Sequence, residues 1–292
     1  MGESAENLDA VDLNSPGRGD EGPKAWSQFC PLPGFGSTSM TEPTEASTTR
    51  IRVVDHEAFT WAVLDRPEAR NAIDLQLVSE LHELCRRLEQ SPRILAITGS
   101  DGIFASGADI RELRDRGPED ALRGINSRIF DRIARLPLPT IAAVDGAAIG
   151  GGAELAYACD FRIASTRAKF GNPETNLGII AGAGACWRLR ELIGLPLANE
   201  ILLAGGRLDA EEALACGLVT RVVAPEEMED AVFKLVERMT KGSTLALRLT
   251  KLALRASSSA HPDIDDVAQA VLFQSVEKRK RMDAFLERGD RS

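Results

Sequence analysis

The sequence predicts an α/β fold. From residue 50 onward, short strand-like runs alternate with amphipathic helical stretches, and the last third of the chain is mostly helical. The chain has 292 residues, which is long enough to bury a full hydrophobic core. Hydrophobic residues make up 43% of the chain and charged residues 27%, which is ordinary for a globular protein. We therefore expect one α/β domain over residues 50–292 with an appended helical region.

The first 49 residues differ from the rest of the chain. They are rich in Ser, Gly, Pro and acidic residues, hold much of the net charge of −9 and show no apolar periodicity, so we predict that they are disordered. Their composition fits neither a secretory signal nor a mitochondrial presequence. Met40 lies just ahead of the first strand-like run and is a possible natural start; a regulatory tail is the alternative.

The first half of the domain shows two strand runs, a helix and a third strand. Residues 51–54 and 59–64 predict a β-hairpin. Residues 74–89 place apolar side chains at three- and four-residue spacing, which predicts an amphipathic helix. Residues 94–98 read as a short buried strand that ends at Gly99.

The second half continues the alternation and then becomes helical. A helical stretch is expected over about residues 119–135, followed by buried strands at 140–144 and 161–164. Beyond Gly182 the pattern is mostly helical, with one strand-like run at residues 218–223.

Composition also argues against several classes of function. No apolar run approaches the ~18 residues of a membrane span, and the acidic net charge lacks the basic footprint of a nucleic-acid binder. The five cysteines show no CxxC spacing, and with three histidines they make a zinc site unlikely. We expect reduced thiols and a cytoplasmic protein.

Three glycine-containing segments carry the chemistry, at residues 104–110, 148–155 and 170–174. Glycine turns that lead into helices leave backbone N–H groups unpaired, and two such groups at one point form an oxyanion hole. Glu154 and Glu174 would add acid and base groups beside it. Each signal is weak alone, because glycine turns are usually only turns and these glutamates could be surface acids. The spacing fits neither a dinucleotide fingerprint nor a Walker motif.

In this order and spacing, the segments resemble the enoyl-CoA hydratase/isomerase (crotonase) family. The resemblance covers about residues 50–288 and includes further matches at residues 64–72, 106–110, 178–184, 203–214 and 217–222. It implies a spiral of ββα units with a C-terminal helical region for trimerisation. It also implies a homotrimer or a dimer of trimers.

The resemblance also implies roles for site residues. The thioester carbonyl of an acyl-CoA would lie between the backbone N–H groups of Ala108 and Gly151, where small residues allow close approach. Glu174 would deliver the α-proton, while Glu154 would orient and help deprotonate the water. Hydration of a 2-trans-enoyl-CoA is the expected reaction, with no metal and no cofactor beyond the CoA of the substrate. Enoyl-CoA isomerisation, acyl-CoA hydrolysis and non-catalytic acyl-CoA binding are the alternatives.

The remaining substrate contacts are also implied by the resemblance. Arg70 would contact a phosphate, although an exposed structural arginine explains it equally well. Phe273 would reach the adenine, often across a subunit interface, and the basic run at residues 278–281 is either part of that contact or a solvated face. The full expected set is Glu68, Ala69, Arg70, Ser106, Gly107, Asp109, Ile110, Gly150, Pro173 and Phe273.

The segment after Gly182 departs from the family pattern. Ala181 stands where proline is common, and Ala185, Cys186 and Trp187 replace a Gly-Thr-Gln run. Trp187 would either narrow the acyl pocket or pack in the core, and core packing is favoured. A cysteine enzyme using Cys186 has little support, because no histidine lies near it in the sequence.

Overall fold

A computed structural model describes residues 49–289. The predicted disordered segment, including Met40, lies outside the described residues except for residue 49. The strands are β1 (Ile51–Asp55), β2 (Phe59–Leu64), β3 (Ile94–Gly99), β4 (Thr140–Val144), β5 (Ala147–Ile149), β6 (Phe161–Ser165), β7 (Lys169–Gly171), β8 (Arg207–Asp209) and β9 (Arg221–Val223). The helices before β6 are α1 (Leu75–Gln90), α2 (Ile110–Asp115), α3 (Pro118–Arg123), α4 (Ile125–Ala134) and α5 (Gly151–Ala158). Those after β7 are α6 (Ala185–Ile193), α7 (Leu195–Ala204), α8 (Ala210–Ala215), α9 (Met228–Thr240), α10 (Thr244–Leu254), α11 (Asp263–Gln274) and α12 (Val276–Gly289).

The strands form two sheets, and from β4 onward the chain contributes strands to both. The larger sheet has the order β1-β2-β3-β4-β6-β9 and is parallel except for the β1–β2 hairpin. The smaller sheet has the order β5-β7-β8. The successive pairs β4–β5, β6–β7 and β8–β9 each give one strand to each sheet. This repetition agrees with the expected spiral of ββα units.

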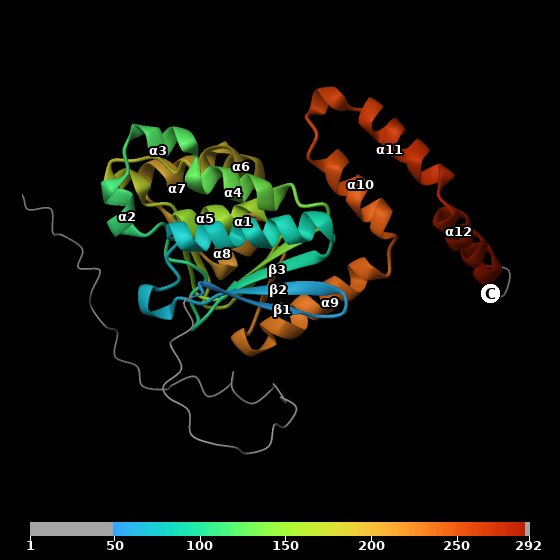
Figure 1. Cartoon of the computed structure of the whole chain (residues 1–292), viewed down its shortest axis with the longest axis horizontal. Coiled ribbons are helices and arrows are strands. Elements are labelled where there is room, and N and C mark those ends of the chain that lie inside the picture. Colours follow the sequence, from blue (N-terminus) through green and yellow to red (C-terminus); the bar gives the residue numbers. More distant parts are fainter. Residues whose placement is uncertain (1–48, 290–292) are drawn as a thin grey trace, which may run out of the picture. The chain divides into compact units, whose positions relative to one another are not determined.

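The larger sheet is covered on both faces, which explains its buried strands. Ala62 and Leu64 of β2 pack in the cluster that includes the apolar side chains of α1, α4 and α5, whereas Phe59, Trp61 and Val63 pack in the cluster that includes α9. Figure 1 shows α9 across the sheet from α1 and α5. The alternation follows from the two-residue period of a strand.

Local signals fix the helix starts in the first half. The Asp74 carboxylate accepts a hydrogen bond from the Leu77 N–H and caps α1, as the predicted helix at residues 74–89 requires.

The single helix expected at about residues 119–135 is wrong, because Gly124, at a φ of 65°, separates α3 from α4. The expectation of one strand beyond Gly182 is also wrong, since β8 precedes β9.

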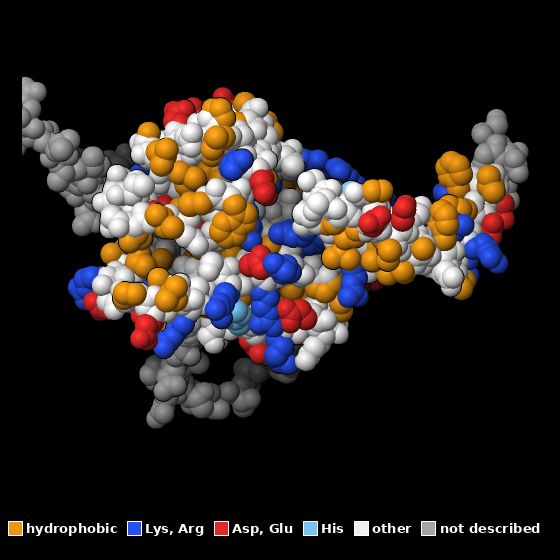
Figure 2. Space-filling model, turned by 90° about the horizontal axis from the view of Figure 1, so that it is seen from above, with side chains coloured by type: hydrophobic (Ala, Val, Ile, Leu, Met, Phe, Trp, Pro, Cys, Tyr) orange, Lys and Arg blue, Asp and Glu red, His pale blue; other side chains and the backbone are white. Residues whose placement is uncertain are grey.

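Helices α10, α11 and α12 form a C-terminal arm, residues 244–289. Lys251 pairs with Asp160 at 2.7 Å, and Arg281 donates hydrogen bonds to the carbonyls of Lys241 and Gly242. No apolar side chain of residues 244–288 is fully buried. Figure 2 shows hydrophobic side chains along this arm. The exposed ones are Leu252, Leu254, Val267, Val271, Phe273, Val276, Met282, Phe285 and Leu286.

Candidate active site

Backbone pairing brings the first two glycine segments together. Ala105 donates a hydrogen bond to the Ala147 carbonyl and accepts one from the Ile149 N–H, so these chain segments lie side by side. A Cβ built on Gly151 would lie 3.4 Å from the Ala108 nitrogen. Within residues 49–289 the N–H groups of Ala108 and Gly151 have no acceptor. Two free donors therefore lie next to each other at the start of α5, as an oxyanion hole requires.

Each of the three consecutive glycines, Gly150, Gly151 and Gly152, faces different neighbouring atoms. Gly150 has a φ of 54°, and a Cβ there would lie 3.0 Å from Glu174 Oε1. A Cβ on Gly152 would lie 2.1 Å from the carbonyl oxygen of Ala105 and could not be accommodated. At Gly151 a Cβ makes only ordinary contacts, so the glycine there leaves the space beside the two donors open.

Glu154 lies on α5, three residues beyond Gly151, and is 3% exposed. Its Oε1 accepts hydrogen bonds from the N–H groups of Ala183, at 2.7 Å, and Ala185, at 3.1 Å. The pKa of Glu154 is raised to about 7, chiefly by burial; the charge of Glu174 contributes to the rise and the backbone donors oppose it.

Glu174 opens the short 3-10 helix Glu174–Leu177 and is 8% exposed. Its Oε1 accepts a 3.4 Å hydrogen bond from Asn172, whereas its Oε2 is buried without a partner. Burial raises the pKa of Glu174 above its ordinary value. Burial therefore disfavours the charged form of both carboxyls.

Asn172 and Tyr157 support Glu174, and neither was among the predicted site residues. The Tyr157 hydroxyl donates to Asn172 Oδ1 at 3.2 Å, and both side chains are buried. Asn172 lies inside the third glycine segment, two residues before Glu174. A polar residue in a run that is otherwise buried is the signal that could have identified it.

A cavity of about 200 Å³ adjoins Glu174. Its apolar lining suits a hydrocarbon chain. Its other lining residues are Asn172, Thr175, Ile180, Ala181, Cys186, Asn199, Leu202 and Leu203. Partial burial raises the pKa of the Cys186 thiol, and the Sγ contacts the Ala181 carbonyl. A nucleophilic cysteine needs a lowered pKa, so the geometry gives no support to a cysteine enzyme.

Trp187 corrects one expectation, because its side chain does not pack in the core. It is 44% exposed, and the guanidinium carbon of Arg188 lies 4.7 Å from its ring centroid. On α6, Ala185, Arg188 and Leu189 face inward, which turns Trp187 to the outer face.

Part of the expected CoA-binding set comes together near the hole. The Ser106 N–H donates to the Arg70 carbonyl, and its hydroxyl contacts the Ala69 carbonyl. The Arg70 side chain is exposed, while Glu68 pairs with Arg66 at 3.7 Å. Pro173 immediately precedes Glu174, and Gly107, with a φ of 115°, precedes Ala108.

Other expected contacts are engaged elsewhere or lie on the arm. Asp109 caps α2 and pairs with Arg66 at 2.8 Å, while the next residue, Ile110, is 57% exposed. Phe273 lies on α11, where the Lys278 ammonium approaches its ring at 4.8 Å. Within the described chain, no hydrogen bond or ring contact joins Phe273 to the hole.

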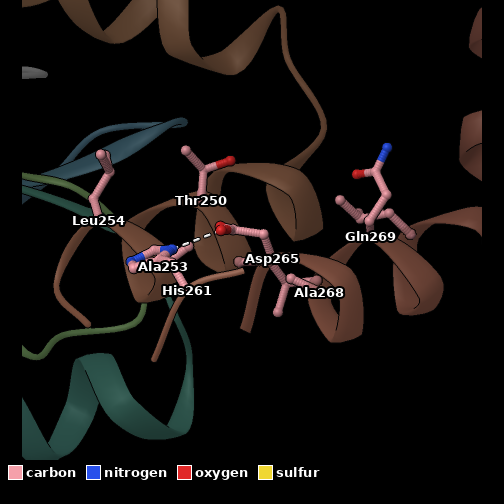
Figure 3. A pocket seen from close by; sticks show the side chains of 9 residues that line it. Thr250, Ala253, Leu254, His261, Asp265, Ala268 and Gln269 are labelled. Carbon is pink, nitrogen blue, oxygen red and sulfur yellow. Dashed lines mark hydrogen bonds and ion pairs between the residues drawn. The ribbon is translucent and has the colours of Figure 1, made fainter. Parts of the chain in front are cut away.

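A second cavity, of about 380 Å³, lies in the arm between α10 and α11. Figure 3 shows the hydrogen bond between His261 and Asp265, at 2.6 Å, on its wall. None of the expected site residues lines it. Across residues 49–289, no three His, Cys, Asp or Glu side chains gather as metal ligands, and no helix has the length and apolar character of a membrane span.

Comparison with known proteins indicates the family and the fold. A family model described as enoyl-CoA hydratase/isomerase matches residues 57–292. The chain is 37% identical to a crotonyl-CoA hydratase of Syntrophomonas wolfei over 80% of this chain and 93% of that protein. It is 35% identical to the enoyl-CoA isomerase/hydratase fer4 of Mycosarcoma maydis over 77% of this chain and 89% of that protein. An enoyl-CoA hydratase structure from Bacillus anthracis matches with a TM-score of 0.77 and 30% identity, over 82% of this chain and 97% of that one.

Proposed function

Because the chain belongs to the enoyl-CoA hydratase/isomerase family, we propose that it adds water to a 2-trans-enoyl-CoA to give a 3-hydroxyacyl-CoA. One observation supports the proposal: Glu154 and Glu174 are both buried, Glu154 lies three residues after Gly151, and Glu174 Oε1 lies 3.0 Å from a Cβ built on Gly150. Paired acids with raised pKa values suit a reaction that needs one acid and one base.

In this proposal the thioester oxygen accepts hydrogen bonds from the N–H groups of Ala108 and Gly151. Negative charge develops on that oxygen as the enolate forms, and one such donor is typically worth about 2.7–4 kcal/mol in the transition state. Gly151 is the first residue of α5, so the positive end of the helix dipole adds to the stabilisation.

The two glutamates complete the reaction. Glu154, ionised, takes a proton from water, and the hydroxide forms a bond to C3 of the enoyl group. Glu174, protonated, gives its proton to C2, so that H and OH are added across the double bond. The pair then exchanges its proton to return to the starting state. The reaction consumes only water, and CoA enters as part of the substrate.

Assembly and CoA binding belong to the same proposal. We propose a homotrimer or a dimer of trimers, supported by the exposed apolar side chains of the C-terminal arm. In that assembly Phe273 of one subunit would reach the adenine bound by its neighbour. Arg70, exposed beside Ser106, would contact a phosphate of CoA.

Isomerisation of an enoyl-CoA is the second candidate, because the relative from Mycosarcoma maydis is named an isomerase/hydratase. The same pair of carboxyls could move a proton between C4 and C2 without adding water. Product analysis separates the two reactions, because only hydration adds the mass of one water molecule. Acyl-CoA hydrolysis would instead release free CoA thiol, and a binding protein would yield no product.

The decisive experiment follows the ultraviolet absorbance of the conjugated thioester of crotonyl-CoA. We expect wild-type protein to remove it, and Glu154→Gln and Glu174→Gln each to lower kcat by about 10²–10⁴-fold. Glu83→Gln, an exposed glutamate on α1, is the matched control and should keep full activity. Tight binding of butyryl-CoA without turnover of crotonyl-CoA would contradict the proposal. Full activity of Glu174→Gln would contradict the assigned roles.

A further inference from the structure

Asn126 is a third polar group at the oxyanion hole. It is the second residue of α4, and its Nδ2 lies 3.7 Å from the position that a Cβ on Gly151 would occupy. The Ala108 nitrogen lies 3.4 Å from the same point. The Gly151 nitrogen is about 2.5 Å from it by covalent geometry alone. Three nitrogen atoms, two from the backbone and one from a side chain, therefore lie within 3.7 Å of one point.

The amide of Asn126 has no structural partner. Its Oδ1 is buried without a hydrogen bond, and no residue in the range 49–289 accepts one from its Nδ2. Asn71 offers the contrast, because its Oδ1 accepts from the Arg66 N–H and its Nδ2 donates to the carbonyls of Ser100 and Ile103. Asn126 as a whole is half-buried, but leaving a buried polar atom such as its Oδ1 unpaired costs about 1–3 kcal/mol, so this position calls for an explanation.

We propose that Asn126 is a catalytic residue whose Nδ2 donates a third hydrogen bond to the thioester oxygen of the substrate. The inference rests on the proposed function, in which that oxygen occupies the hole. A side-chain amide can serve in an oxyanion hole as well as a backbone N–H group, provided that it is held in place beforehand. It differs from the donors of Ala108 and Gly151 in one respect: a substitution can remove it.

Kinetics of three variants test the role of Asn126. Asn126→Leu keeps the approximate size and removes the donor, whereas Asn126→Asp keeps the shape and adds a negative charge. Arg128→Leu, exposed on the same helix, is the control and should behave as wild type. We expect Asn126→Leu to lower kcat on crotonyl-CoA by about 10²–10³-fold, with KM within about threefold of wild type. Asn126→Asp should lose at least as much.

Two kinetic outcomes would overturn the proposal. An unchanged kcat for Asn126→Leu would show that the oxygen does not need this donor. A loss that grows steadily from crotonyl-CoA to dec-2-enoyl-CoA would show that Asn126 contacts the acyl tail instead, because the thioester oxygen is common to all chain lengths.

A second measurement does not depend on hydration. Acetoacetyl-CoA forms an enolate with its own ultraviolet absorbance, and donors at the hole should stabilise that enolate when it is bound. We expect a smaller enolate fraction on Asn126→Leu than on wild type at the same pH. Equal fractions on both proteins would overturn the inference. If wild type hydrates no enoyl-CoA but Asn126→Leu still lowers the enolate fraction, the hydratase proposal fails and this inference stands.

Discussion

Around the N–H groups of Ala108 and Gly151, polar groups lack hydrogen-bond partners in the described chain, whereas along the C-terminal arm apolar side chains are exposed. The N–H groups of Ala108 and Gly151 and the Oε2 atom of Glu174 belong to the first region. Phe285 and Leu286, at 70% and 63% exposure, belong to the second. In the isolated chain, unpaired polar groups and exposed apolar side chains both cost free energy. Under the proposals above, the two regions would meet different partners: a polar small molecule at the backbone donors and an apolar protein surface at the arm.

Two neighbouring glycines give the sharpest test of the first region. Gly151→Ala should fold normally and lower kcat by about 10²–10³-fold, because the methyl group fills the space beside the Ala108 nitrogen. Gly152→Ala should instead destabilise the fold, because its Cβ would lie 2.1 Å from the Ala105 carbonyl oxygen. Thermal unfolding and crotonyl-CoA turnover measure the two effects. If Gly152→Ala folded normally and kept full activity, the two glycines would not have the different roles assigned to them here.

The second region is tested by making the arm polar. We expect Phe285→Glu together with Leu286→Glu to weaken subunit association, because burial of each side chain is worth about 1.5–3 kcal/mol. Sedimentation should show smaller species, while circular dichroism should show unchanged helix content. Glu287→Gln, on the same helix, is the control. An unchanged sedimentation coefficient would mean that these two side chains lie outside any interface.

A smaller effect concerns stability at the site. The pKa of Glu154 is raised from 4.5 to about 7 by burial, so the folded state binds a proton more tightly than the unfolded state. The contribution of Glu154 to the free energy of unfolding is fully present below pH 4.5 and is lost as the pH rises through 7. Glu154→Gln should therefore be more stable than wild type by about 1–3 kcal/mol at pH 8, with the gain vanishing near pH 4.5. Urea unfolding at both pH values checks this, and equal stability at pH 8 would contradict it.

Long periodic elements were predictable from the sequence, and most of the three-residue strands were not; β9, inside the run expected at residues 218–223, is the exception. The β1–β2 hairpin and α1 follow from residue spacing and from the cap at Asp74. Strands β5, β7 and β8 have only three residues each, too few to show a period. These short strands form because chain segments distant in the sequence supply their hydrogen-bonding partners. Local residue patterns do not show which segments meet in the fold.

The site shows the same limit. Glycine turns and two glutamates could be found from the sequence and the family resemblance, but the role now proposed for Asn126 was not expected, because asparagine on a helix usually faces solvent. A signal was present: Asn126 precedes Ile129 and Phe130 by three and four residues and so shares their buried face. Trp187 was misplaced because an aromatic residue in an apolar stretch usually packs inside, whereas the face it occupies depends on how α6 is oriented.

The hydrogen bonds of Glu154 to Ala183 and Ala185 have a consequence for any attempt to redirect this enzyme. Ala185 is the first residue of α6, so the carboxylate also closes the open start of that helix. A designer who replaces Glu154 with an apolar residue to obtain a different reaction removes a helix cap together with the proposed base. Replacements that keep an acceptor oxygen, such as glutamine, retain the hydrogen bonds to Ala183 and Ala185 while removing the carboxylate. Only such replacements change the chemistry at residue 154 without also removing the cap of α6.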